Sequence, residues 1–368
     1  MEAFLLKMLV YILFIIGFLL LIKGGDYLVS GSSTIAKSFG ISDLIIGLTV
    51  VSFGTSAPEL IVNVLASIGG SADIAIGNVL GSNIANILLI VGCTAVLCDL
   101  PLKRDTLLSE IPFSVLAIVL VGFLANASLM KDSELETISR LDGGILLIFF
   151  ALFMTYVFYV AFEDKPEIKV KPHELVVHGK NSEIDNSEIN ESEINKSDSP
   201  KVDKSDKSDK SDDEDEELTS SKAWLYIAIG MIALFIGGKW VVDGAIHIAR
   251  IFGLTERLIG LTVIAIGTSL PELVTSIIAA KKGAVDIAIG NAIGSNIFNL
   301  LWILGISSII KPLPFQTVNN IDIVILMIAS SLLILSLATG KRRAIDRNDG
   351  ILFLVLYATY LVFCIYNG

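Results

Sequence analysis

Residues 47–60 read GLTVVSFGTSAPEL, and residues 260–273 read GLTVIAIGTSLPEL, so one motif occurs twice in the chain. A second motif follows each copy: residues 73–86 read DIAIGNVLGSNIAN, and residues 286–299 read DIAIGNAIGSNIFN. The offset between the copies is 213 residues, and it holds without a gap across residues 39–101 of the first copy. Chance does not produce a match of this length. The chain therefore consists of two related halves.

The composition indicates an integral membrane protein. Hydrophobic residues make up 53% of the chain, and its mean hydropathy is +0.74. The apolar residues come in blocks of about 20 or more, long enough to cross a hydrocarbon core of roughly 30 Å. We expect an all-α fold with ten transmembrane helices, near residues 3–33, 42–68, 72–98, 106–128, 142–162, 223–250, 255–281, 285–310, 319–339 and 348–366.

These segments divide into two five-helix repeats, residues 1–162 and residues 222–368, joined by residues 163–221. An odd number of spans in each half places the two copies in opposite orientations in the bilayer. Inverted repeats are typical of secondary transporters, whose sites lie near the membrane midplane where the repeats meet.

The connecting segment is strongly acidic. Between Lys180 and Glu217 it carries 15 acidic and 6 basic residues, which accounts for most of the net charge of −11. Its low content of apolar residues predicts a disordered linker. A calcium-sensing tail is an alternative interpretation, which we favour less than a solvated connector.

Lysine and arginine in the short loops predict the orientation, because cytoplasmic loops carry more of them. Nine lie on one side: Lys37, Lys103, Arg104, Lys281, Lys282, Lys341, Arg342, Arg343 and Arg347. Five lie on the other: Lys131, Arg140, Arg250, Arg257 and Lys311. We expect a multi-pass protein of the cell membrane with both termini outside and the linker in the cytoplasm.

One glutamate lies within the apolar segment of each motif. Glu59 and Glu272 sit near the middle of their segments, and neither segment offers a basic partner. A glutamate that snorkels or forms an ion pair is the alternative, but a charge at this depth usually faces a cavity and serves function.

Proline breaks the helix beside each glutamate. Pro58 and Pro271 have no N–H, so the carbonyls around residues 54–55 and 267–268 lose helical partners. Such carbonyls are tolerated at membrane depth where they line a cavity. Hydroxyls stand beside them at Thr55, Ser56, Thr268 and Ser269. These hard oxygen ligands suit Ca²⁺ better than Mg²⁺ or a soft metal.

The second motif adds amides and hydroxyls. Ser82 and Asn86 share a helix face, and so do Ser295 and Asn299. Four further asparagines are equally compatible with cation ligands and with interhelical hydrogen bonds: Asn78, Asn83, Asn291 and Asn296. Close helix packing explains the glycine pairs Gly77/Gly81 and Gly290/Gly294, and an acidic helix start explains Asp73 and Asp286.

The charge of the two glutamates suggests obligatory exchange. One Ca²⁺ neutralises a charge of −2, and so do two or more monovalent cations. An empty, doubly charged pocket is costly to close off in a low dielectric. The protein should therefore switch the side of the membrane to which its site opens only when cations occupy the site.

At these motifs the sequence strongly resembles the calcium/cation antiporter superfamily, and within it the prokaryotic sodium/calcium exchangers. The resemblance implies ten helices around a diamond of four cation sites, and export of one Ca²⁺ by entry of three Na⁺ through alternating access. It also implies that the first and sixth segments slide against the rest.

The resemblance assigns roles to eleven residues. Glu59 and Glu272 would chelate Ca²⁺ and serve Na⁺, with the carbonyls of Thr55 and Thr268. The flanking Na⁺ sites would use Ser56, Ser269, Ser82, Ser295 and the carbonyl of Ala265. Asn86 and Asn299 would line the middle position. Many relatives carry aspartate where Asn299 stands, and its absence here argues for a potassium-independent exchanger.

Other functions remain as alternatives. A proton-coupled or potassium-dependent calcium antiporter keeps the fold, although the Gly-Asn-x-x-Glu pattern of the proton branch is missing. A passive cation channel fits the inverted repeat less well. We expect no enzyme, because no nucleophile–base pair is evident, and no cofactor. Three scattered histidines and three cysteines in apolar segments predict no metal site, and we expect the protein to act as a monomer.

Overall fold

The computed structural model describes residues 2–101, 110–127, 137–163, 219–253, 265–339 and 344–367. These residues belong to one compact unit, Met1–Lys165 with Leu218–Gly368. The expected linker lies almost entirely outside the described residues, as does the start of the expected segment 255–281.

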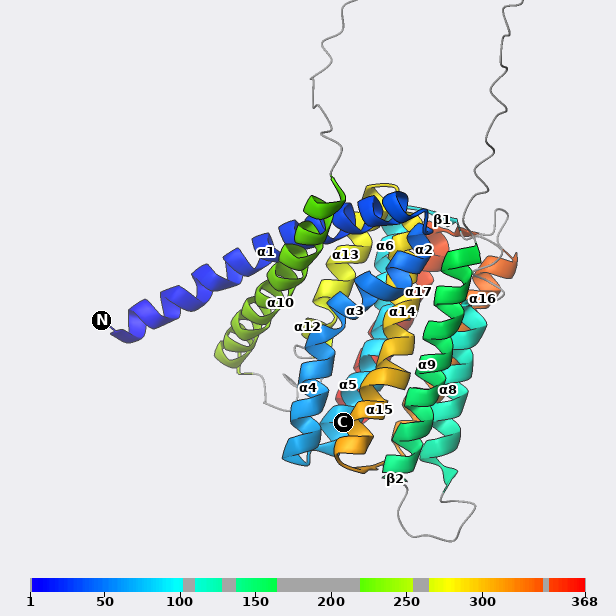
Figure 1. The fold of residues 1–368 in the computed structure, drawn as a ribbon. Helices are drawn as coiled ribbons and strands as arrows, with labels where there is room; N and C mark the ends of the chain where they lie inside the picture. Colours follow the sequence, from blue (N-terminus) through cyan, green and yellow to red (C-terminus); the bar gives the residue numbers. More distant parts are fainter. Residues whose placement is uncertain are drawn as a thin grey trace, which may run out of the picture. The chain divides into compact units, whose positions relative to one another are not determined.

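The first half contains α1 (Glu2–Phe39), α2 (Asp43–Ile46), η1 (Gly47–Val51), α3 (Ser52–Thr55), α4 (Ala57–Gly69), α5 (Ala72–Ala85), η2 (Asn86–Val91), α6 (Gly92–Leu97), β1 (Leu100–Pro101), α8 (Glu110–Ala125), β2 (Thr137–Ile138) and α9 (Arg140–Glu163). The second half contains α10 (Ser220–Ile251), α12 (Ala265–Thr268), α13 (Leu270–Lys281), α14 (Val285–Ile297), η5 (Phe298–Ile303), α15 (Leu304–Ile310), β3 (Leu313–Pro314), α16 (Asn319–Thr339), β4 (Ala344–Ile345) and α17 (Arg347–Asn367). Helix lies over some part of each of the ten expected segments (Figure 1).

Length and composition support fewer spans than the ten expected. Among the described residues, seven helices are long and apolar enough to cross a membrane, and the bent pair formed by Asp43–Thr55 and Ala57–Gly69 makes eight. The helix α8 is shorter than a full span, and the residues before α12 are not described. The chain is thus a multi-pass membrane protein.

The two halves exchange equivalent contacts. Strand β1 pairs antiparallel with β4, and β2 pairs antiparallel with β3, so each two-residue strand finds its partner in the other half. Helix α6 contacts α17 in the same way that α15 contacts α9. The sequence repeat is therefore matched by a repeat of contacts.

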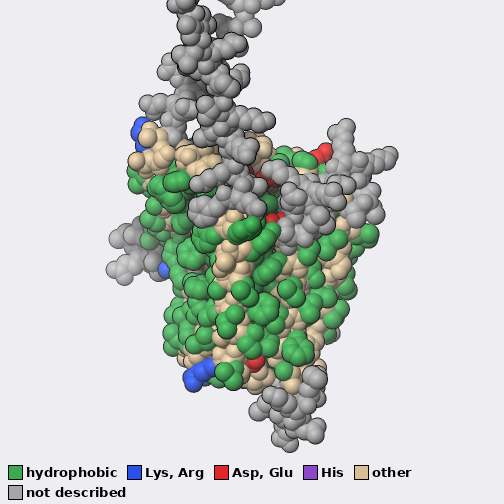
Figure 2. All heavy atoms as spheres, turned by 45° about the vertical axis from the view of Figure 1, so that its right-hand side comes forward, with side chains coloured by type: hydrophobic (Ala, Val, Ile, Leu, Met, Phe, Trp, Pro, Cys, Tyr) green, Lys and Arg blue, Asp and Glu red, His purple; other side chains and the backbone are tan. Residues whose placement is uncertain are grey.

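The second motif forms the centre of the unit. In the span Ala72–Leu97, 78% of the most apolar window is buried, and the same fraction is buried in Val285–Ile310, against 17% in Arg347–Tyr366. The outer helices turn large apolar side chains outward, as lipid contact requires. Figure 2 shows hydrophobic side chains over most of one face, with charged side chains gathered mainly toward its two ends.

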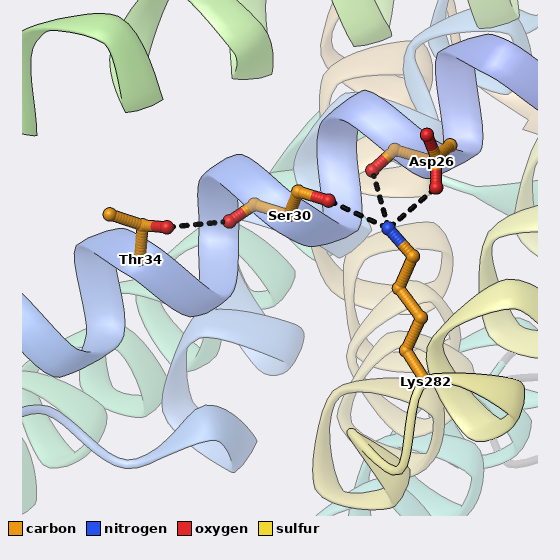
Figure 3. Close-up of polar contacts among 4 residues, drawn as sticks. All are labelled: Asp26, Ser30, Thr34 and Lys282. Atoms are coloured by element: carbon orange, nitrogen blue, oxygen red, sulfur yellow. Dashed lines mark hydrogen bonds and ion pairs between the residues drawn. The ribbon is translucent and has the colours of Figure 1, made fainter. Parts of the chain in front are cut away.

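The long helices α1 and α10 pack against each other through small residues. A Cβ atom added to Gly24 would lie 2.9 Å from the carbonyl oxygen of Gly230, so only glycine allows this approach of the two backbones. Helix α1 also meets the end of α13, where the Lys282 ammonium forms an ion pair with Asp26 and donates a hydrogen bond to Ser30 Oγ at 2.7 Å (Figure 3).

In the described part of the chain, three π-helical turns interrupt the helices beside the motifs, and the sequence did not predict them. Turn η1 precedes the break at Ser56, while η2 begins at Asn86 and η5 contains Asn299. A π-turn holds one residue more than an α-turn and is frequent at functional sites. Turns η2 and η5 each contain an asparagine expected to bind a cation, and η1 is separated from the expected ligand Thr55 only by the rest of α3.

Candidate cation site

The expected helix breaks are present in both halves. Helix α3 ends at Thr55 and α4 begins at Ala57, with Pro58 in its first turn and a bend of 48° between the two pieces. Ser269 separates α12 from α13 with nearly the same backbone angles as Ser56. The missing proline N–H is tolerated in the first turn of the new helix, so the chain restarts there.

The two breaks place both glutamates at helix N-termini inside the protein. Glu59 lies in the first turn of α4 and Glu272 in the first turn of α13, and each is only 1% exposed. The positive end of the helix dipole favours a carboxylate at such a position. The interpretation that these residues snorkel to the surface is therefore wrong.

Each half supplies a serine to the glutamate of the other half. Ser56 Oγ donates to Glu272 Oε1 at 3.0 Å, and Ser269 Oγ donates to Glu59 Oε1 at 3.5 Å. The Ser295 hydroxyl joins this cluster, since its oxygen lies 3.0 Å from Ser56 Oγ. Five of the expected site residues, from both halves, are thus linked through side-chain contacts.

The asparagines of the second motif mostly make hydrogen bonds between helices. Thr55 Oγ1 donates to Asn291 Oδ1 at 3.0 Å, and Thr268 Oγ1 donates to Asn78 Oδ1 at 3.3 Å. Asn86 Nδ2 donates to Asn296 Oδ1 at 3.0 Å. The two threonine hydroxyls are therefore used to join the halves, which leaves the threonine carbonyls as the groups available to a cation.

Several buried oxygens of the cluster have no hydrogen-bond partner within the described part of the chain. They are Glu59 Oε2, Glu272 Oε2, Ser82 Oγ, Asn86 Oδ1 and Asn299 Oδ1. Buried acceptors normally have a donor, and an oxygen that lacks one calls for an explanation such as a bound ion. A set of carboxylate, hydroxyl and amide oxygens is what Ca²⁺ and Na⁺ bind.

Ala265, the last of the expected ligands, is the first described residue of α12. Its role as a carbonyl ligand stays a prediction. Asn83 is fully buried, and neither its Oδ1 nor its Nδ2 meets a partner among the described residues.

The close helix packing expected of the glycine pairs is observed for one of the two pairs. Gly290 and Gly294 pack closely on the backbone at Leu44 and Leu48, whereas Gly77 and Gly81 have no described atom within 4 Å of an added Cβ. Their equivalent partners fall in residues 254–264, outside the described chain.

Asp73 lies in the first turn of α5 and accepts a hydrogen bond from Gln316 Nε2 at 2.9 Å. Asp286 likewise lies in the first turn of α14. Both positions fit the acidic helix start that the sequence suggested.

Two supporting residues were not expected to act where they do. Asn291 Nδ2 donates to the carbonyl of Glu272 at 3.3 Å and to Ser276 Oγ at 3.0 Å, both within its own half. Because its Oδ1 also accepts from Thr55 of the first half, this one side chain joins the two halves. Asn63 Nδ2 donates to the carbonyl of Glu59 at 2.9 Å. Polar residues four positions after each glutamate were visible in the sequence and were the signal that could have identified Asn63 and Ser276.

Known proteins share both the sequence and the fold. The family model for "Sodium/calcium exchanger protein" matches residues 9–159 and 222–366. The sodium/calcium exchanger MaX1 of Methanosarcina acetivorans is 35% identical over 97% of this chain and 98% of its own length. The putative antiporter CaxA of Alkalimonas amylolytica is 35% identical over 96% of this chain and 98% of its own.

A solved structure agrees with these relatives. The sodium–calcium exchanger NCX_Mj, determined after soaking with Na⁺, superposes with a TM-score of 0.72 at 29% identity and covers 97% of this chain and 99% of its own. The match extends over both halves, which agrees with the repeat of the glutamate and asparagine motifs. The chain therefore belongs to the sodium/calcium exchanger family of cation/Ca²⁺ antiporters.

Proposed function

We propose that the chain exchanges Ca²⁺ for Na⁺ across the membrane by alternating access, with Glu59 and Glu272 as the central ligands. The observation that carries the proposal is the pair of buried glutamates, one from each half. Each has one oxygen on a serine of the opposite half and a second oxygen without a described partner. A divalent cation placed between them would be neutralised by ligands from both halves.

The charge of the site supports coupled exchange over a leak. Two carboxylates at 1% exposure, with no described basic side chain bonded to either, require cations for neutrality. Desolvating an unpaired charge costs several kcal/mol. Closing the site around Ca²⁺ or around several Na⁺ avoids this cost. The loaded protein therefore switches between its outward-facing and inward-facing conformations, and the empty protein does not.

The oxygens around the carboxylates form the proposed Na⁺ sites. They come from the carbonyls of Thr55, Thr268 and Ala265, the hydroxyls of Ser56, Ser269, Ser82 and Ser295, and the amide oxygens of Asn86 and Asn299. We infer a ratio of three Na⁺ to one Ca²⁺ from the family resemblance. Because Asn299 carries no charge, the middle position adds no carboxylate and the exchange should not need K⁺.

The proposed topology has ten spans in two inverted repeats, residues 1–162 and 222–368, with both termini outside and the linker 163–221 in the cytoplasm. Helix α8 and the α12–α13 pair complete the count of ten. The α1–α10 pair is the element that would slide, because its glycine-rich contact joins the two helices to each other. One chain holds ligands from both halves, so a monomer would suffice.

Calcium uptake by proteoliposomes tests this function. Vesicles loaded with Na⁺, with K⁺ or with a proton gradient should take up ⁴⁵Ca²⁺ only when Na⁺ can flow out, and Glu272→Gln should abolish the uptake. Asp73→Asn is the matched control, since it removes an exposed carboxylate from the start of α5. Uptake driven by protons alone would assign the protein to the proton-coupled branch, and uptake that needs no counter-ion would indicate a channel.

A further inference from the structure

One face of α4 carries polar side chains beyond Glu59. Asn63 and Ser67 follow it at intervals of four residues, so all three lie on the same side of the helix. Both are 0% exposed, although they lie on the way from the glutamate to the end of α4. A buried polar row between an ion site and a helix end is unusual in a membrane protein.

Helix α15, from the other half of the chain, packs against α4. It contacts α4, and the two helices lie side by side in Figure 1. The Lys311 ammonium, just after α15, lies 2.5 Å from the position of a Cβ atom at Gly70, just after α4. Ser307 precedes Lys311 by about one turn, as Ser67 precedes Gly70, so the two serines lie at a similar level.

The polar seam, formed by Asn63, Ser67 and Ser307, has unsatisfied hydrogen-bonding groups. Asn63 Oδ1, Ser67 Oγ and Ser307 Oγ are buried, and none has a partner in the described regions. Buried polar atoms in folded proteins are nearly always paired with protein or water. Water that enters an opened seam would therefore supply hydrogen-bond partners that these three groups lack in the closed one.

The equivalent positions of the second half are satisfied. Ser276, which corresponds to Asn63, bonds Asn291 at 3.0 Å. Position 280, which corresponds to Ser67, is alanine. Thr94, which corresponds to Ser307, donates to the carbonyl of Ile90 at 2.7 Å. At these three positions, helices α13 and α6 therefore lack the unsatisfied groups found at Asn63, Ser67 and Ser307. The described part of α13 does hold one buried hydroxyl without a partner, Thr275 Oγ1, but the backbone of Thr275 lies beside Gly25 of α1.

We propose that the polar seam is a one-sided gate that opens into water. When α15 and Lys311 move away from α4, water fills the row of Asn63, Ser67 and Ser307, and a small hydrophilic cation gains access to the Glu59 side of the site. The α13–α6 contact stays dry in the same conformation. The use of this gate for exchanged ions rests on the proposed function, whereas its unequal hydration does not.

Thiol labelling tests the gate, because it reports contact with water without any transport. Cys93, Cys98 and Cys364 are first replaced by alanine. Ser67→Cys and Ser307→Cys are then compared with the matched variants Ala280→Cys and Thr94→Cys, all in detergent without an ion gradient. The probe is 2-aminoethyl methanethiosulfonate, a small cationic reagent that reacts with thiols in water.

We expect both seam variants to react at least tenfold faster than their matched variants. Saturating Ca²⁺ should slow the seam reaction, because an ion bound at Glu59 holds the gate closed. Equal rates in the two halves, faster labelling at Ala280→Cys, or four unreactive variants would overturn the proposal. Two seam positions on separate helices are tested, so that one misfolded variant does not decide the result. A proton-coupled exchanger would show the same labelling pattern, so failure of the proposed Na⁺ coupling would not change this test.

Discussion

Replacing Glu272 by glutamine keeps the shape of the side chain but removes one of the two buried charges. The wild-type carboxylate is 1% exposed, accepts a hydrogen bond from Ser56 and has a second oxygen without a described partner. In Glu272→Gln an amide takes that position. If its oxygen keeps the bond to Ser56, its NH₂ points to where the unpartnered oxygen faced a cation.

The size of the effect follows from the burial of the pair. Removing one partner from a buried, desolvated charge pair costs about 3–5 kcal/mol. That range corresponds to a loss of Ca²⁺ affinity on the order of 100-fold to several thousand-fold. A single remaining charge still balances one monovalent cation, so Na⁺ binding should weaken less than Ca²⁺ binding.

Equilibrium binding of ⁴⁵Ca²⁺ to the purified protein measures this loss, and the stabilisation of the protein by Ca²⁺ against heat gives a second readout. Asp73→Asn should change the affinity less than twofold. A folded Glu272→Gln protein that binds Ca²⁺ within fivefold of the wild type would refute the assignment of this glutamate as a ligand.

Three further predictions concern the support of the site, the α1 contact and the coupling. Asn291→Ala should lower the free energy of unfolding by about 1–3 kcal/mol, because its hydrogen-bond partners stay buried. Thermal unfolding should show a smaller loss for Asn78→Ala, and equal losses would contradict the larger supporting role given to Asn291. Lys282→Met should lower the free energy of unfolding by less than about 1 kcal/mol, since both side chains of its ion pair are more than one-third exposed. A larger coupling energy in a double-mutant cycle with Asp26→Asn would show this expectation to be wrong. A three-for-one exchange moves one net positive charge out of the vesicle for each Ca²⁺ that enters. A membrane potential of 100 mV, positive inside, should therefore raise the equilibrium Ca²⁺ accumulation of Na⁺-loaded vesicles about 50-fold. Uptake that does not change when valinomycin sets the membrane potential would indicate an electroneutral ratio.

The sequence was sufficient to locate the helices and the two breaks. Long apolar blocks and a gap-free repeat are local signals, and Pro58 and Pro271 act on the backbone beside them. The burial of Glu59 and Glu272 followed from the absence of basic residues in their segments. These features depend on composition and spacing, which the sequence displays directly.

The partners of the polar side chains could not be predicted in this way. Asn291 and Asn63 occupy non-equivalent positions in the repeat, yet each ends beside the backbone of a glutamate. Which of several oxygens a side-chain amide meets depends on the packing of helices that lie far apart in the chain. The threonine hydroxyls of the first motif illustrate the same point, because they bond asparagines of the other half and do not stay free for an ion.

The π-helical turns η2 and η5 give both halves the same local irregularity beside the site. They occupy nearly equivalent positions, Asn86–Val91 and Phe298–Ile303, and the offset of 213 residues runs through both without a gap. The hydrogen bonds of a π-turn span five residues and not four, so each turn shifts the register of the helix that follows it. Deleting one residue within either turn would therefore restore the α-helical ladder and rotate the side chains beyond the deletion by about 100° around the helix axis.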